Sequence, residues 1–106
     1  MIERLSTIPD NPAIAQCCKA WLRAFDKGMA EKDNRVYAAF IAGKDYRRTI
    51  PPLAGEESIR NFIACVAHGM LIGAVTGADA TKLLYAAQVA LAAVRRQPSS
   101  PKVDAA

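Results

Sequence analysis

Residues 58–75, SIRNFIACVAHGMLIGAV, decide the fold that this sequence predicts. From Phe62 to Val75 the only strongly polar side chain is His68. At helical spacing, apolar residues cover two opposite sides of this stretch, and such a helix belongs in a protein core or in a membrane. The uninterrupted apolar part is about 14 residues long, whereas a bilayer span needs roughly 20. The stretch therefore favours a buried central helix, with a transmembrane helix as the alternative.

Two glycines in this stretch, Gly69 and Gly73, lie four residues apart. This spacing allows the backbones of two helices to approach closely. The expected neighbour is the segment KLLYAAQVALAAV, whose alanines offer little side-chain bulk. We therefore predict that the glycine pair packs against the last helix, and the alternative is a dimer seam along the same two residues.

The composition predicts a single all-α domain. The chain has 106 residues, of which 52% are hydrophobic and 23% charged, and it is rich in alanine. One core of ordinary size is compatible with this length, whereas separate cofactor and catalytic domains are not. We expect a compact four-helix bundle-like domain over residues 1–97, in which the central third helix is buried. Residues 98–106 are expected to form a disordered tail.

Four helices are expected, over residues 12–32, 35–45, 58–75 and 79–96. Asn11 followed by Pro12 is typical of a helix start, and Asp33 and Asn34 give a second cap signal. The proline pair after Ile50 stops any helix, and Gly77 is expected to end the central one. The predicted inward stripes are Ile14, Cys18, Trp21, Leu22, Phe25 and Met29; Val36, Phe40 and Gly43; and Leu84, Ala87, Leu91 and Val94.

The cysteines and the histidine allow a metal or thiol-redox interpretation. Cys65 and His68 are three residues apart, so they share one helix face. Zinc or copper would accept such ligands together with thiols from the first helix. The alternative is that these side chains are ordinary core residues, since cysteine is among the most often buried residue types. The candidate ligands are Cys17, Cys18, Cys65 and His68.

A basic cluster surrounds the proline-containing loop and the start of the central helix. The net charge of +4 is compatible with an acidic partner or a nucleic acid without requiring either. Cations around an aromatic side chain are suited to phosphate contacts. The alternative is a solvated loop with scattered ion pairs. The predicted patch comprises Lys44, Tyr46, Arg47, Arg48 and Arg60.

No catalytic constellation is recognisable in the sequence, so we expect neither an enzyme nor a cofactor. No pair of carboxylates lies in an apolar setting, and no phosphate-binding glycine loop, H-E-x-x-H motif or nucleophile elbow is present. The N-terminus lacks the apolar region of a signal peptide, and the three cysteines are an odd number. Both observations favour the cytoplasm, without disulfide bonds or membrane association.

The segments IPPLAGEE, IRNFIACVAHGMLIGA and KLLYAAQVAL resemble small, uncharacterised all-helical proteins of bacteria that are often carried near mobile elements. The resemblance covers roughly residues 35–97. It implies a cytoplasmic bacterial protein that acts by binding, and it implies no catalytic residue.

Together these observations predict a non-enzymatic helical protein-interaction or regulatory module, with a second copy of the chain as one possible partner. A small nucleic-acid-binding regulator that uses the basic patch is the first alternative. A metal or thiol-redox protein is the second.

Overall fold

The computed structural model describes residues 11–96, and all the regular structure in that range is helical. The helices are α2 (Pro12–Lys32), α3 (Arg35–Thr49), α4 (Glu56–Leu71) and α5 (Gly77–Arg96). The predicted all-α, bundle-like class is confirmed. The tail predicted for residues 98–106 lies outside the described residues. None of the helices described here combines the length and the hydropathy that crossing a membrane requires.

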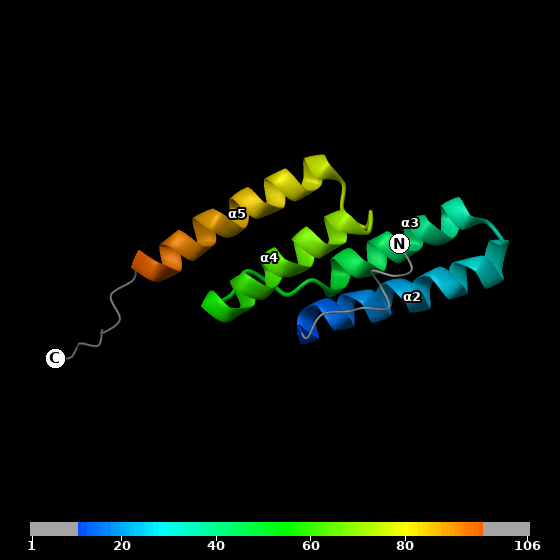
Figure 1. The fold of residues 1–106 in the computed structure, drawn as a ribbon, viewed down its shortest axis with the longest axis horizontal. Helices are drawn as coiled ribbons and strands as arrows, with labels where there is room; N and C mark the ends of the chain where they lie inside the picture. Colours follow the sequence, from blue (N-terminus) through cyan, green and yellow to red (C-terminus); the bar gives the residue numbers. More distant parts are fainter. Residues whose placement is uncertain (1–10, 97–106) are drawn as a thin grey trace.

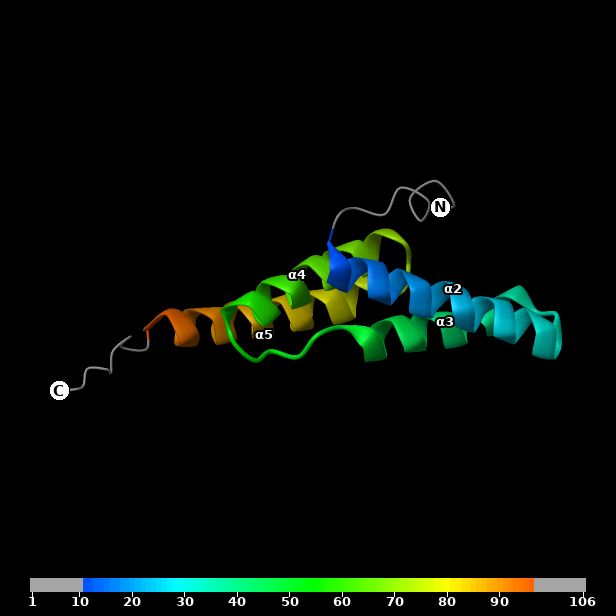
Figure 2. The ribbon, with the colours of Figure 1, turned by 90° about the horizontal axis from the view of Figure 1, so that it is seen from below.

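The four helices form two antiparallel hairpins, α2 with α3 and α4 with α5 (Figure 1). The hairpins are staggered along the long axis, so the bundle is elongated. The turn between α2 and α3 extends beyond the α4–α5 hairpin at one end, and the C-terminal end of α5 extends beyond α2 at the other (Figures 1 and 2). The shared core therefore lies only where the hairpins overlap.

Local capping explains where the first two helices begin. The Asn11 side chain accepts hydrogen bonds from the backbone N–H groups of Ala13 and Ile14, at 2.9 and 3.1 Å, directly before Pro12. Asp33 adopts a left-handed conformation with φ 48° and ends α2. Asn34 then caps α3 by accepting from the N–H of Tyr37 at 3.1 Å. The cap signals in the sequence are thus confirmed.

The packing of α2 on α3 is closer than the sequence pattern indicated. A Cβ atom added to Gly28 would lie 2.8 Å from the Cα of Ala38, so the two backbones are nearly in contact there. Small residues, including Ala24 and Ala42, therefore form the buried side of this hairpin. Trp21 and Phe25 stack with ring centroids 5.0 Å apart, but both are only half-buried on the flank.

The predicted inward stripe of α3 is wrong. Val36 is 80% exposed and Phe40 is 62% exposed, because the alanine side of α3 faces α2 instead. The helix also runs four residues further than residue 45, to Thr49, and ends where Ile50 takes an extended conformation before Pro51. This extension places Tyr46 on the buried side, four residues after Ala42.

Helix α4 is central, because it packs against α5 and α2 and contacts α3 through Tyr46. Its buried side comprises Ile59, Phe62, Cys65, Val66 and Gly69. The expectation that the whole stretch 58–75 is helical and shielded is wrong in two respects. Met70 and Leu71 are 44% and 58% exposed. The helix ends at Leu71, and Ile72, Ala74 and Val75 fold back into the core as a turn.

The turn after α4 depends on Gly73 rather than on Gly77. Gly73 has φ +80°, a conformation that other residues rarely adopt, and the N–H groups of Ala74 and Val75 bond back to the carbonyl of Gly69. Gly77 is the first residue of α5. The side chain of Thr76 caps α5 by accepting a hydrogen bond from the N–H of Asp79 at 3.1 Å.

Candidate functional site

The structure does not assemble the predicted basic patch. Tyr46 is fully buried, and its hydroxyl donates a 2.6 Å hydrogen bond to the Cys65 carbonyl, so it is absent from the surface. Arg47 donates to the Ala74 carbonyl at 2.7 Å and thereby joins α3 to the turn after α4. Arg48 forms a 3.6 Å ion pair with Asp45.

Lys44 is also exposed, and its ammonium lies 6.0 Å from the centre of the Phe40 ring. Three cations of the patch therefore lie on α3, where Arg48 pairs with Asp45 of the same helix and Arg47 bonds to Ala74 of the turn after α4.

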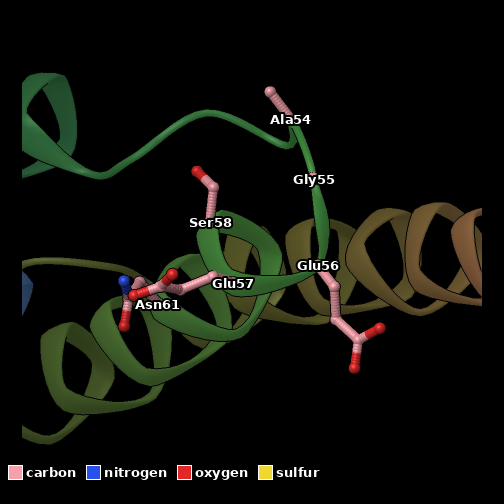
Figure 3. Close-up of a pocket in the computed structure, with 6 residues that line it drawn as sticks. All are labelled: Ala54, Gly55, Glu56, Glu57, Ser58 and Asn61. Atoms are coloured by element: carbon pink, nitrogen blue, oxygen red, sulfur yellow. The ribbon is translucent and has the colours of Figure 1, made fainter.

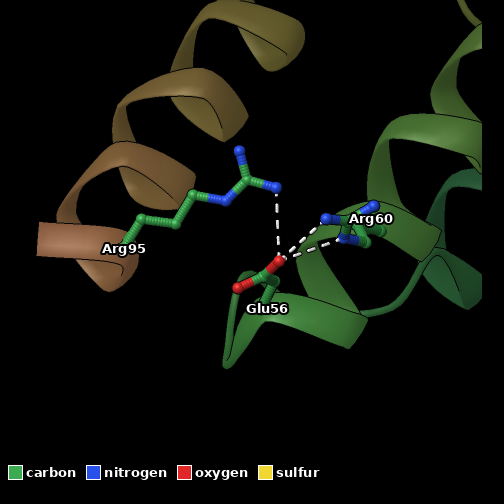
Figure 4. A network of polar contacts seen from close by, with 3 residues as sticks. All are labelled: Glu56, Arg60 and Arg95. Carbon is green, nitrogen blue, oxygen red and sulfur yellow. Dashed lines mark hydrogen bonds and ion pairs between the residues drawn. The ribbon is translucent and has the colours of Figure 1, made fainter. Parts of the chain in front are cut away.

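Arg60 belongs to a different part of the surface. Its guanidinium pairs with Glu56 at 2.8 Å, and Arg95 of α5 approaches the same carboxylate oxygen at 3.2 Å (Figure 4). Hydrogen bonds from Arg60 and then Arg95 lower the pKa of Glu56 below its ordinary value. This network ties the start of α4 to the end of α5. It lies at the opposite end of α4 from Ala74, which Arg47 contacts.

The three cysteines gather in the shared core. Cys17 and Cys18 of α2 and Cys65 of α4 are fully buried, and all are free thiols. The side-chain hydrogen bond to Cys65, together with burial, raises the pKa of Cys17, and the same bond lowers that of Cys65. Burial also raises the pKa of Cys18 and of the neighbouring Tyr46.

His68 is half-buried one turn after Cys65 on α4. Within residues 11–96, no three or more His, Cys, Asp or Glu side chains are arranged to hold a metal ion.

The glycine pair does not pack against α5. A Cβ atom on Gly69 would lie 2.7 Å from Cε1 of Tyr46 and 2.8 Å from Cγ2 of Val75, so the close neighbours of Gly69 are α3 and the following turn. Nothing lies within 4 Å of the corresponding position on Gly73. A dimer seam along the two glycines is therefore wrong as well, because Gly69 is covered within its own chain.

A shallow hollow lies at the first turn of α4, after the loop that joins the two hairpins. Its lining residues include Gly55, which has φ +89°, and the side chains of Glu57, Ser58 and Asn61. Glu57 and Asn61 lie on one side of it, and the carboxylate of Glu56 points away from them (Figure 3). The Ser58 hydroxyl donates to the Pro52 carbonyl at 2.6 Å. These contacts account for the loop geometry.

The exposed apolar side of α5 is the main surface feature that the sequence did not predict. Only Ala80 and Ala87 of this 20-residue helix are buried. Its inward stripe is confirmed in part: Leu84, Leu91 and Val94 pack against the core but stay half-buried. On the opposite side, Tyr85 is 68% exposed and Val89 is 50% exposed.

We define the outer face of α5 by the exposed residues opposite its contact with α4. A signal for it exists in the sequence, because the only strongly polar residue from Leu83 to Val94 is Gln88. A helix of that composition has more apolar surface than one neighbour can cover. The outer face comprises Tyr85, Ala86, Val89, Ala92 and Ala93.

An apolar groove between α4 and α5 borders the outer face. It is lined by Ile63 of α4 and by Thr81, Leu84, Tyr85 and Gln88 of α5. Tyr85 belongs to both features, so the exposed apolar surface continues from one helix to the next. Comparisons of the chain with protein-family models, with curated proteins and with solved structures find no match.

Proposed function

We propose that this chain is a small helical protein-interaction module of the bacterial cytoplasm that acts by binding, and that the α4–α5 hairpin is its binding element. The observation that carries the proposal is the outer face of α5. There, Tyr85 and Val89 are exposed to solvent, and the main packing partner of the helix is α4. Contiguous exposed apolar surface on a small domain is typical of a protein interface.

The physical argument concerns the free energy of exposed apolar area. Burying apolar surface stabilises a complex by about 25 cal/mol per Å², and aromatic side chains such as tyrosine are enriched in binding hot spots. Alanines beside Tyr85 and Val89 lose little side-chain entropy when a partner covers them. The outer face is therefore uncharged from Tyr85 to Ala93, and Lys82 lies one turn before Tyr85 on the same side of α5.

The nucleic-acid alternative has less support. Arg47, Arg48 and Arg60 each have a partner within the chain, and Arg60 lies away from the other two. The thiol-redox alternative also has less support, because the three thiols are buried away from any exposed surface. Neither alternative accounts for the apolar face of α5.

A photo-crosslinking experiment tests the proposed function. The amino acid p-benzoylphenylalanine replaces Tyr85 in one variant and Phe40 in a matched one, because Phe40 is also aromatic and 62% exposed but lies on the other hairpin. Both variants are irradiated in the natural host and as purified protein. We expect a discrete adduct from position 85 and none from position 40. Equal adducts from both positions, or no adduct from position 85, would contradict the proposal.

A further inference from the structure

Two cations of α5 lie at the two ends of its outer face. Lys82, Val89 and Arg96 follow the i, i+7, i+14 spacing of one helical stripe, and Tyr85 lies beside it. All four side chains are exposed. The outer face is therefore an apolar strip with a positive charge beyond each end, and the two charges are about 21 Å apart along the helix axis.

Neither of these cations has an ion-pair partner within residues 11–96. Arg60 and Arg95, by contrast, both pair with Glu56 on the side of α5 that faces α4. Asp79 lies three residues before Lys82, but no ion pair joins the two in the described part of the chain. The charges of Lys82 and Arg96 are thus available to carboxylates of another molecule.

We propose that the outer face of α5 binds a helix of another protein that carries an apolar stripe between two carboxylates. The inference rests on the proposed function and names the chemistry of the partner. Carboxylates about four helical turns apart would meet Lys82 and Arg96 together. The apolar residues between them would cover Tyr85 and Val89. Complementary charges at the two ends of an apolar contact fix its register and the choice of partner.

The small residues of the outer face allow a partner helix to come close. Ala86 and Ala93 lie on one side of Val89, and Ala92 lies on the other. The distance between packed helices depends on the size of the side chains at the contact. Tyr85 is the one bulky aromatic side chain between the two cations, so the partner helix needs a small residue opposite it and larger ones further along.

The same charges disfavour a second copy of the chain on this face. Antiparallel α5 helices would set Lys82 of one copy opposite Arg96 of the other, and parallel helices would set each cation opposite its own equivalent. Like charges in contact weaken an interface and suppress wrong partners. The strip is also only one helix wide, about 30 Å by 10 Å, so its area is below the roughly 800 Å² that a standard interface buries on each partner. A transient contact with an oppositely charged helix fits both observations.

An anionic membrane is another surface that attracts cations around an apolar strip. Helices that lie in a bilayer interface insert bulky side chains such as Trp, Phe and Leu between the lipids. Three of the five residues of the outer face are alanine, so this strip has little to insert. A protein helix is therefore the better match.

Photo-crosslinking from position 85, combined with charge reversal, tests the proposal. The full chain with p-benzoylphenylalanine at position 85 is irradiated in the natural host, and mass spectrometry identifies the crosslinked peptide. We expect a segment of another protein with two acidic residues about 14 positions apart and apolar residues at helical spacing between them. Lys82→Glu combined with Arg96→Glu should lower the adduct yield by at least about tenfold, because like charges then face each other.

Lys19→Glu combined with Arg23→Glu is the matched control, because both cations are exposed on α2 and the net charge falls by the same amount. This pair should leave the yield unchanged, and circular dichroism shows whether both double variants keep their helices. Exchanging the two acidic residues of the identified partner for lysine should restore the adduct with the chain that carries Lys82→Glu and Arg96→Glu. A loss of yield caused by misfolding would not be restored in this way.

The outcomes separate this inference from the proposed function. Three results would overturn the acidic partner helix and leave the interaction module standing: an adduct yield that charge reversal does not change, a crosslinked segment without the two acidic residues, or an adduct to a second copy of the chain. An adduct to phospholipid alone, or no adduct at all, would overturn both.

Discussion

At the scale of single residues, Tyr46 organises the point where the two hairpins meet. Its ring is fully buried, its hydroxyl bonds to the Cys65 carbonyl, and it lies against Gly69. The sequence placed this residue in a loop patch, because its basic neighbours Arg47 and Arg48 suggested a solvated segment. Only the spacing of four from Ala42 indicated the buried side, and that signal requires the helix to continue past residue 45.

The close approach at Gly69 gives a prediction at this scale. Gly69→Ala should reduce the free energy of unfolding by about 1–3 kcal/mol, because the new methyl group would overlap a Tyr46 ring that is buried and hydrogen-bonded. Alanine is otherwise the better helix former by roughly 1 kcal/mol, so propensity alone predicts the opposite sign. Urea unfolding followed by circular dichroism measures the difference.

The control for that substitution is Gly77→Ala at the first residue of α5. Nothing lies within 4 Å of a Cβ atom there, and we expect a change within about 0.5 kcal/mol. If Gly69→Ala were as stable as Gly77→Ala, the packing described for Tyr46 and Gly69 would be incorrect.

At the scale of the helices, the sequence predicted which elements exist better than which side of each is buried. Two helix starts were predicted correctly from the cap residues Asn11 and Asn34, because capping is a local interaction. The prediction of which side of α3 faces inward was wrong, because Gly28 lets α2 approach the alanine side of α3 closely. Hydrophobic periodicity predicted that Val36 and Phe40 face the core. Periodicity contains no information on how closely a neighbouring backbone approaches the helix.

The start of α5 gives a prediction at the scale of one element. Thr76→Ala removes the side-chain oxygen that accepts the Asp79 N–H at 3.1 Å, and it should destabilise the fold by about 1 kcal/mol. Thr81→Ala is the matched control. The Thr81 hydroxyl only bonds back to the Gly77 carbonyl within the helix, so its loss should change stability by less than about 0.5 kcal/mol. Thermal unfolding of both variants decides whether Thr76 is the cap.

At the scale of the whole molecule, the candidate site follows from the stagger of the hairpins. The core that joins them is confined to the overlap, where Cys17, Tyr46 and Cys65 meet. Helix α5 packs mainly on α4 and keeps an apolar face on which Tyr85 is 68% and Val89 50% exposed. A sequence shows that Leu83 to Val94 is apolar, but the stagger depends on tertiary contacts that no local pattern encodes. The exposed face was therefore not predictable, although its composition was visible.

The same stagger leaves the end of α5 dependent on the Glu56 network, and this predicts a response to acid. Arg60 and Arg95 lower the pKa of Glu56. The stability that its ion pairs contribute is therefore fully present above the ordinary carboxyl pKa and is lost as the pH falls through the lowered pKa. We expect the amides of the last two turns of α5 to lose protection from hydrogen exchange between about pH 6 and pH 3.5, relative to those of α2.

Because the ion pairs are exposed, the change in protection should be modest and should shrink in high salt. Glu56→Gln should remove most of the difference between the two pH values, since the amide does not titrate. Glu57→Gln, one residue further along α4, should keep it, because no ion pair of Glu57 joins α4 to α5 in the described structure. An equal loss of protection in wild type and Glu56→Gln would mean that another group holds the end of α5 in place.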